Sequence, residues 1–74
     1  MMKSKVNKTI QKKTGLPLVI EKMEGVYYLC SALDAPDSVI DMLSKKSQTC
    51  LHATSLNQLT LSQWVEAAQG ILKD

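Results

Sequence analysis

Residues 16–32, LPLVIEKMEGVYYLCSA, constrain the fold of this chain more than any other segment. Two runs rich in Val, Ile, Leu and Tyr flank the dipeptide Glu24-Gly25, which is the pattern of a β-hairpin. Gly25 supplies the positive φ that a tight turn requires. Glu24 is an unfavourable first residue for a type I′ turn, so a three-residue loop or a G1 bulge is the alternative to a two-residue loop.

The same segment predicts which side chains enter the core, because side chains alternate between the two faces of a strand. With a two-residue loop, one face consists of Leu18, Ile20, Tyr27 and Leu29. The opposite face consists of Val19, Glu21, Tyr28 and Cys30. The first face is the better core, so we expect the second face to point away from it.

The segment before the hairpin has a helical pattern. Residues 4–14 place the apolar Val6 and Ile10 four positions apart, as on one side of a helix. Gly15 fits the left-handed position that ends many helices. Pro17 prevents the helix from continuing.

A short helix is predicted after the hairpin, within residues 34–47, DAPDSVIDMLSKKS. Asp34 or Asp37 can cap its start, and a proline between them is tolerated in the first turn. Its apolar edge consists of Val39, Ile40 and Leu43.

The last twenty residues, SLNQLTLSQWVEAAQGILKD, contain the clearest helix start in the chain. With Thr60 as N-cap, Gln63 completes a T-x-x-Q capping box, and Leu59 and Trp64 form a hydrophobic staple. The apolar residues that follow recur at helical spacing: Leu61, Trp64, Val65, Ala68, Ile71 and Leu72. Gln63 and Trp64 are therefore interpreted as structural residues.

Residues 49–56, TCLHATSL, are predicted to form a third strand at the edge of the sheet. Leu51 and Ala53 would face one way, and Cys50, His52 and Thr54 the other. The expected fold is a single α+β domain over residues 1–74, with a three-stranded, mostly antiparallel sheet, an N-terminal helix, a short middle helix and a C-terminal helix. A parallel crossover into the third strand is the open alternative.

Composition indicates a water-soluble protein with an aliphatic core. The chain has 74 residues, of which 45% are hydrophobic, and it contains no Phe. No apolar run approaches the ~18 residues of a membrane-spanning helix, and no apolar stretch follows the basic N-terminus as in a signal peptide. We therefore expect a cytoplasmic protein with no membrane contact, in which Cys30 and Cys50 stay reduced.

Charge is distributed unevenly along the chain. Residues 1–20 contain five lysines and no acid, whereas residues 21–74 contain four lysines and seven acids, so +5 and −3 give the net +2. Phosphate contacts are therefore an alternative role for the N-terminal lysines Lys5, Lys8, Lys12 and Lys13. The absence of Arg and the modest net charge argue against a dedicated nucleic-acid-binding module.

Catalytic and metal-binding patterns are weak. His52 is the single histidine, and together with Cys50 and Cys30 it offers three metal ligands, but structural zinc requires four and no fourth ligand is evident. The chain has no nucleophile elbow and no Gly-rich phosphate loop. We therefore expect no enzymatic activity, no metal and no cofactor.

Segments of the chain resemble a family of small uncharacterised proteins of bacteria, phages and mobile elements. The resemblance runs through EGVYYL and TCLHATSLNQLTLSQW and covers residues 5–68, with Leu56 to Trp64 as its most specific part. Family members carry tyrosines where this chain has His52 and Thr54, and an arginine where it has Ser55. The resemblance implies an α-β-β-β-α-like domain from an accessory gene and names no reaction.

A protein-binding role is the function that these patterns favour. So small a sheet cannot have all its faces and edges covered, so an apolar surface is expected on the outer side of the hairpin. The candidate residues are Val19, Tyr28, Cys30 and His52. The partner is expected to be another protein or a second copy of the chain, bound to this surface or paired along the third strand. Weak nucleic-acid binding through the N-terminal lysines is the alternative.

Overall fold

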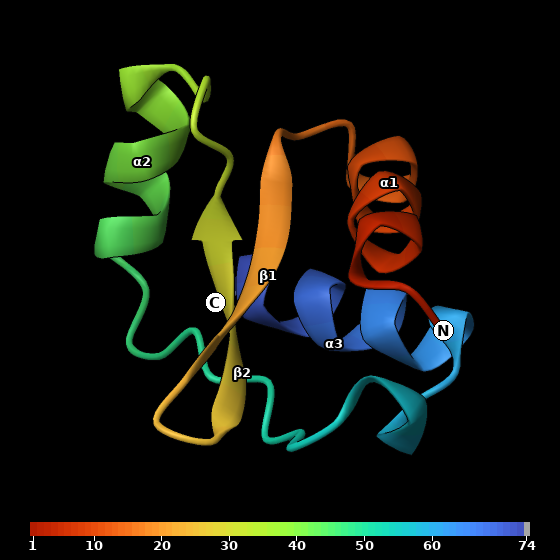
Figure 1. The fold of residues 1–74 in the computed structure, drawn as a ribbon. Coiled ribbons are helices and arrows are strands. Elements are labelled where there is room, and N and C mark those ends of the chain that lie inside the picture. Colours follow the sequence, from red (N-terminus) through yellow and green to blue (C-terminus); the bar gives the residue numbers. More distant parts are fainter. Residues whose placement is uncertain (74) are drawn as a thin grey trace.

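The elements follow one another in the order helix, strand, strand, helix, 3₁₀ helix and helix, in a computed structural model that describes residues 1–73. Their bounds are α1 Lys3–Thr14, β1 Leu18–Met23, β2 Val26–Ser31, α2 Asp37–Ser44, η1 Leu56–Gln58 and α3 Leu61–Leu72. The predicted α+β class and the three predicted helices are confirmed. Figure 1 shows α1 and α2 on opposite sides of the hairpin, with α3 behind it.

The hairpin closes through a two-residue loop. Its register runs from Leu18↔Ser31 to Met23↔Val26, which leaves Glu24 and Gly25 as the loop residues. Their φ values are 53° and 87°, and a positive φ at both loop residues is typical of the tight turns that match strand twist. The longer loops considered from the sequence are therefore not used, and Glu24 adopts a conformation that non-glycine residues rarely take.

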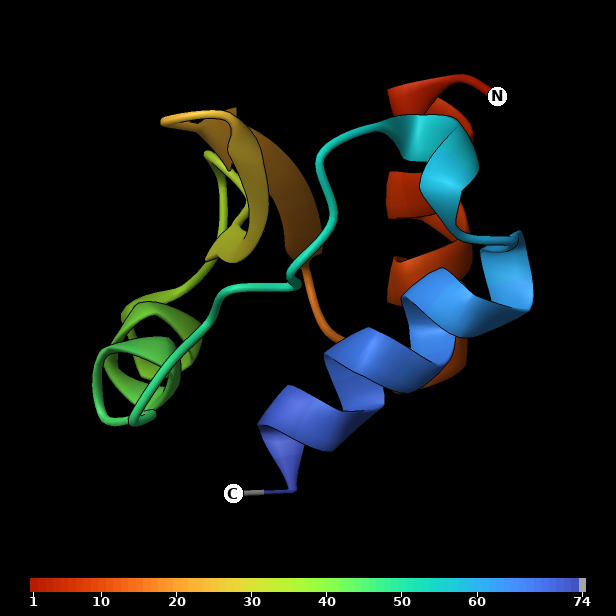
Figure 2. The same cartoon turned by 90° about the horizontal axis from the view of Figure 1, so that it is seen from below.

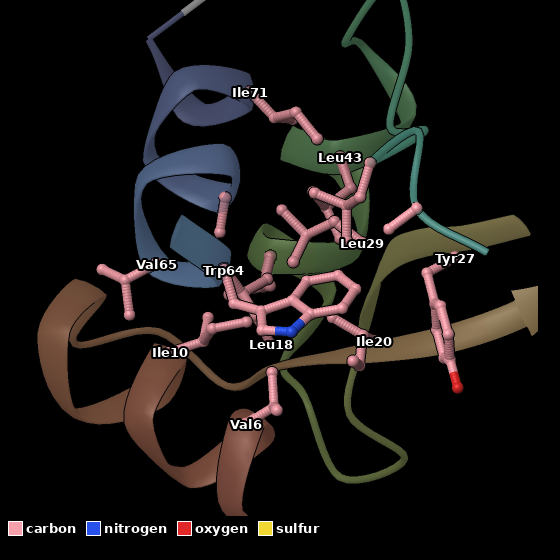
Figure 3. Close-up of a cluster of buried hydrophobic side chains, with 14 residues drawn as sticks. Val6, Ile10, Leu18, Ile20, Tyr27, Leu29, Leu43, Trp64, Val65 and Ile71 are labelled. Atoms are coloured by element: carbon pink, nitrogen blue, oxygen red, sulfur yellow. The ribbon is translucent and has the colours of Figure 1, made fainter. Parts of the chain in front are cut away.

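The predicted core face of the hairpin is confirmed. All four of its residues are buried: Leu18, Ile20, Tyr27 and Leu29. They meet Val6 and Ile10 of α1 and Trp64 of α3, as Figure 3 shows. The inner face of the hairpin therefore packs against the two long helices, α1 and α3.

Two amide side chains of α1 bond the outer edge of β1. The backbone N–H of Ile20 donates to Asn7 Oδ1 at 2.8 Å, and Gln11 Nε2 donates to the backbone C=O of Leu18 at 3.0 Å. Asn7 and Gln11 are four positions apart, so both lie on the side of α1 that faces the strand. They satisfy edge groups that would otherwise be open to another strand.

Trp64 anchors α3 as the sequence predicted. The capping box is complete: Gln63 N–H donates to Thr60 Oγ1 at 3.2 Å, and Thr60 N–H donates to Gln63 Oε1 at 2.9 Å. The indole is fully buried and its Nε1 donates to the C=O of Leu56 at 3.1 Å. Its ring meets the Tyr27 ring edge-on, with centroids 5.5 Å apart.

No third strand is found within residues 1–73, so the predicted three-stranded sheet is corrected to a two-stranded one. The segment 49–53 makes one isolated antiparallel bridge, Tyr28↔Cys50, which excludes the parallel crossover. His52 has φ 57°, and this left-handed residue interrupts the regular ladder. As a result the N–H of Tyr27 bonds the C=O of Ala53 at 2.9 Å, instead of the C=O of Leu51 that a regular ladder would use.

Helix α2 closes the core at the side of the molecule away from α1 (Figure 2). Val39 and Leu43 are buried, whereas Ile40, which was expected on the same apolar edge, is exposed. Pro36 occupies the N-cap position, so no aspartate side chain caps the helix. Beyond the helix, Lys46 Nζ donates to the C=O of Leu72 at 3.0 Å and ties this side of the molecule to the end of α3.

Replacing Trp64 by alanine should remove the centre of the core. We expect Trp64→Ala to lower the free energy of unfolding by about 3–5 kcal/mol, because the cavity would be large and the Leu56 carbonyl would lose its donor. Urea denaturation followed by far-UV circular dichroism measures this. Gln69→Ala, at an exposed position of the same helix, should change it by less than about 0.5 kcal/mol. Equal losses in the two variants would contradict a central role for Trp64.

Removing one of the amides that bond the β1 edge should cost stability and expose the strand. Asn7→Ala leaves the Ile20 N–H without its partner, so we expect a loss of about 1–3 kcal/mol. Light scattering should also show more concentration-dependent aggregation, because the edge becomes available for pairing. Lys8→Ala, at the next and exposed position, is the control. Equal stability and equal aggregation of the two alanine variants would show that the hydrogen bond from Ile20 to Asn7 does not protect the β1 edge.

Candidate functional site

The side of the hairpin opposite the core carries a connected set of side chains. We define the outer face by Val19, Glu21, Tyr28, Cys30 and Cys50. Val19 pairs with Cys30 and Glu21 with Tyr28 in the strand register, and Tyr28 pairs with Cys50 in the bridge. Paired residues in antiparallel strands point to the same face, and Tyr28 and Cys30, two positions apart on β2, place the two sets on one face. All but the exposed Glu21 are half-buried.

Three of the four residues predicted as a partner surface therefore lie together: Val19, Tyr28 and Cys30. His52, the fourth, is exposed, and its imidazole Nδ1 lies near Cys50 Sγ. Cys50 was not predicted as part of this surface. Its alternation with Leu51, which is buried, is the signal that could have placed it there.

The Cys30 thiol is partly buried and lies near an acidic side chain. Burial raises the pKa of the Cys30 thiol above its ordinary value, and the nearby negative charge of Glu21 raises it further. Glu21 itself forms a salt bridge with Lys3 at 3.1 Å on the surface. Cys30 therefore stays protonated at neutral pH and contributes to the outer face as a small apolar group.

Cys50 has a different environment, formed by the left-handed residue that follows it. The backbone N–H of His52 donates to Cys50 Sγ at 3.4 Å, and the imidazole Nδ1 lies 3.8 Å from the same sulfur. The ligand set considered from the sequence, Cys30 with Cys50 and His52, is not assembled. In the described part of the chain, no three or more His, Cys, Asp or Glu side chains are grouped to hold a metal ion.

The N-terminal lysines divide into two groups. Lys5, Lys8 and Lys12 are exposed and lie three and four positions apart, so they form one stripe along α1 with steps of about 4.5 and 6 Å. Lys13 lies apart from the stripe. It lines a depression of about 420 Å³ between the ends of α1 and α3, together with Thr14, Gln69, Leu72 and Lys73.

The three lysines of the stripe also differ from Lys3 and Lys45 in their salt bridges. Lys3 and Lys45 form salt bridges with Glu21 and Asp41. Among residues 1–73, no acid lies within salt-bridge distance of the stripe. Lys12 and Lys13 also occupy the last turn of α1, where cations complement the negative end of the helix dipole. Of the four lysines predicted to contact phosphates, three are therefore aligned, and Lys13 lies apart from them.

Comparisons with known proteins yield no relative. No family model, no curated protein and no solved structure matches the chain. The resemblance to small bacterial and phage proteins therefore stays a prediction. Within residues 1–73 no helix has both the length and the apolar character needed to cross a bilayer. The geometry described above is the basis for any functional proposal.

The contribution of Glu21 to the Cys30 environment can be measured. In a Cys50→Ser background, Glu21→Gln should lower the pKa of the Cys30 thiol, because the thiolate no longer faces a negative charge. It should remain above the ordinary value, since burial persists. The pH dependence of the alkylation rate reports this pKa. Glu24→Gln, in the hairpin loop, is the control and should leave the pKa unchanged.

Proposed function

We propose that this chain is a small non-enzymatic accessory protein that binds another protein through the outer face of its hairpin. The observation that carries the proposal is the connected, half-buried set Val19, Tyr28, Cys30 and Cys50 on the side of the sheet away from the core. Tyrosine is enriched at protein interfaces because it combines a large apolar ring with a polar end. Tyr28 lies between Glu21 and Cys50, at the centre of this set.

Contact through side chains of the face is favoured over pairing along an edge. The outer edge of β1 is bonded by Asn7 and Gln11 of α1. On the opposite side, the backbone of β2 bonds the segment 49–53, whose ladder is interrupted at His52. A partner that adds a strand requires a continuous free edge, and both edges lack one. The partner is therefore expected to contact the side chains of the outer face, with Tyr28 at the centre of the contact.

A photo-crosslinking amino acid at position 28 tests the proposal. A benzophenone side chain in place of Tyr28 should give a discrete crosslinked product in cells, and its mass identifies a second copy of the chain or a different protein. The same side chain in place of Glu66, on the exposed side of α3, is the control. No product at position 28, or identical products at both positions, would refute binding through the outer face.

Nucleic-acid binding is a second candidate, supported by the unpaired stripe Lys5, Lys8 and Lys12. Three aligned ammonium groups along about 10 Å of helix can approach phosphates of one strand without first breaking an ion pair. Recognition would be weak and independent of sequence, because the chain has no Arg to read base edges.

A mobility-shift assay at two salt concentrations tests this second candidate. The triple variant Lys5→Gln, Lys8→Gln and Lys12→Gln should abolish any shift seen at low salt, since each lost phosphate contact reduces the salt slope by about 0.9. The matched control is Lys22→Gln with Lys45→Gln and Lys73→Gln. Both triples change the net charge from +2 to 2 − 3 = −1, so only the position of the charges differs. An equal loss of the mobility shift in both triple variants would exclude a specific role for the stripe.

A further inference from the structure

One of the two non-glycine residues with a positive φ in the described part of the chain lies beside a thiol. His52 has φ 57°, in the left-handed region that residues other than glycine seldom occupy. This conformation interrupts the regular pairing with β2. It brings both the backbone N–H and the imidazole of His52 to the sulfur of Cys50, at 3.4 Å for the N–H and 3.8 Å for Nδ1. A nucleophile with a base within contact distance is the arrangement of an activated thiol.

The imidazole of this pair is exposed, and both cysteines are half-buried. Cys30, on the neighbouring strand and the same face, provides an internal contrast. No imidazole contacts its sulfur; the Cys30 thiol lies 3.8 Å from the C=O of Tyr28, an acceptor that cannot stabilise a thiolate. Burial and Glu21 also raise the pKa of Cys30. The two thiols should therefore differ strongly in reactivity.

We infer that Cys50 is a modification site, where the thiol forms mixed disulfides with small-molecule disulfides with the assistance of His52. In the tautomer protonated at Nε2, His52 Nδ1 takes the proton of Cys50 Sγ. The sulfur then attacks one sulfur of the incoming disulfide. The new S–S bond forms as the old one breaks, and the leaving thiolate takes the proton from the imidazolium. The backbone N–H of His52 stabilises negative charge on Sγ before the attack.

The two cysteines make a direct comparison feasible. The Cys30→Ser variant retains only Cys50, and the Cys50→Ser variant retains only Cys30. Each folded variant is mixed with an aromatic disulfide, dithiobis-nitrobenzoate, and the released thiolate is followed by absorbance. We expect Cys50 to react about tenfold faster than Cys30, or more. In denaturing urea, which removes the contacts of the fold, the two rates should agree within about twofold.

The role of His52 is tested in the Cys30→Ser background. His52→Asn keeps a residue that tolerates the left-handed conformation but removes the base, and His52→Gly does the same with no side chain. Both should retain the circular dichroism spectrum of the parent and slow Cys50 at least about fivefold. Glutathione disulfide followed by mass spectrometry should give the same order of rates. The inference is overturned if Cys50 reacts no faster than Cys30, or if both His52 variants react as fast as the parent.

Discussion

The burial of Trp64 is the interaction on which the rest of this structure depends. The indole is fully buried, bonds the carbonyl of Leu56 in η1, and meets the ring of Tyr27 in β2. It therefore joins the last helix to the loop before it and to the inner face of the hairpin. A chain of 74 residues buries only roughly 60% of its unfolded surface, so a single large side chain has an unusual share of the core. With Trp64 and the core residues fixed inside, the outer residues of the hairpin, Tyr28 among them, are directed away from the helices.

The parts of the fold that follow from neighbouring residues could be predicted from the sequence. The capping box of Thr60 and Gln63 and the two faces of the hairpin are local patterns, and each has its expected geometry. The third strand was predicted from alternation between residues 49 and 56, and Leu51 and Ala53 are indeed buried. Alternation cannot reveal that His52 adopts a left-handed conformation, because nothing in its neighbours requires it. The pattern of burial was therefore right and the pattern of hydrogen bonds was not.

Features that depend on how separate elements meet were not predictable. The amides of Asn7 and Gln11 read in the sequence as polar residues on a helix, and their bonds to β1 exist only because α1 packs beside that strand. For Cys50, alternation predicts a side opposite to Leu51, but its place beside Tyr28 depends on the bridge between the two segments. Of the candidate surface, the hairpin residues were predictable because they belong to one local unit. From the segment 49–53, His52 was predicted for this surface, whereas Cys50, which joins it through the bridge to Tyr28, was not.

The treatment of the sheet edges connects the fold to the proposed function. Natural proteins protect the edges of small sheets, and here one edge is bonded by a helix while the other bonds the segment 49–53, whose ladder is interrupted at a left-handed residue. The helix bonds to the β1 edge and the left-handed conformation of His52 each have a further effect on the same hairpin. Closing the β1 edge leaves the outer face as the accessible part of the sheet, and the turn at His52 brings an imidazole to Cys50 beside Tyr28. The distortion that interrupts the ladder is therefore also the feature that distinguishes one thiol from the other, and it does so at the border of the surface proposed to bind a partner.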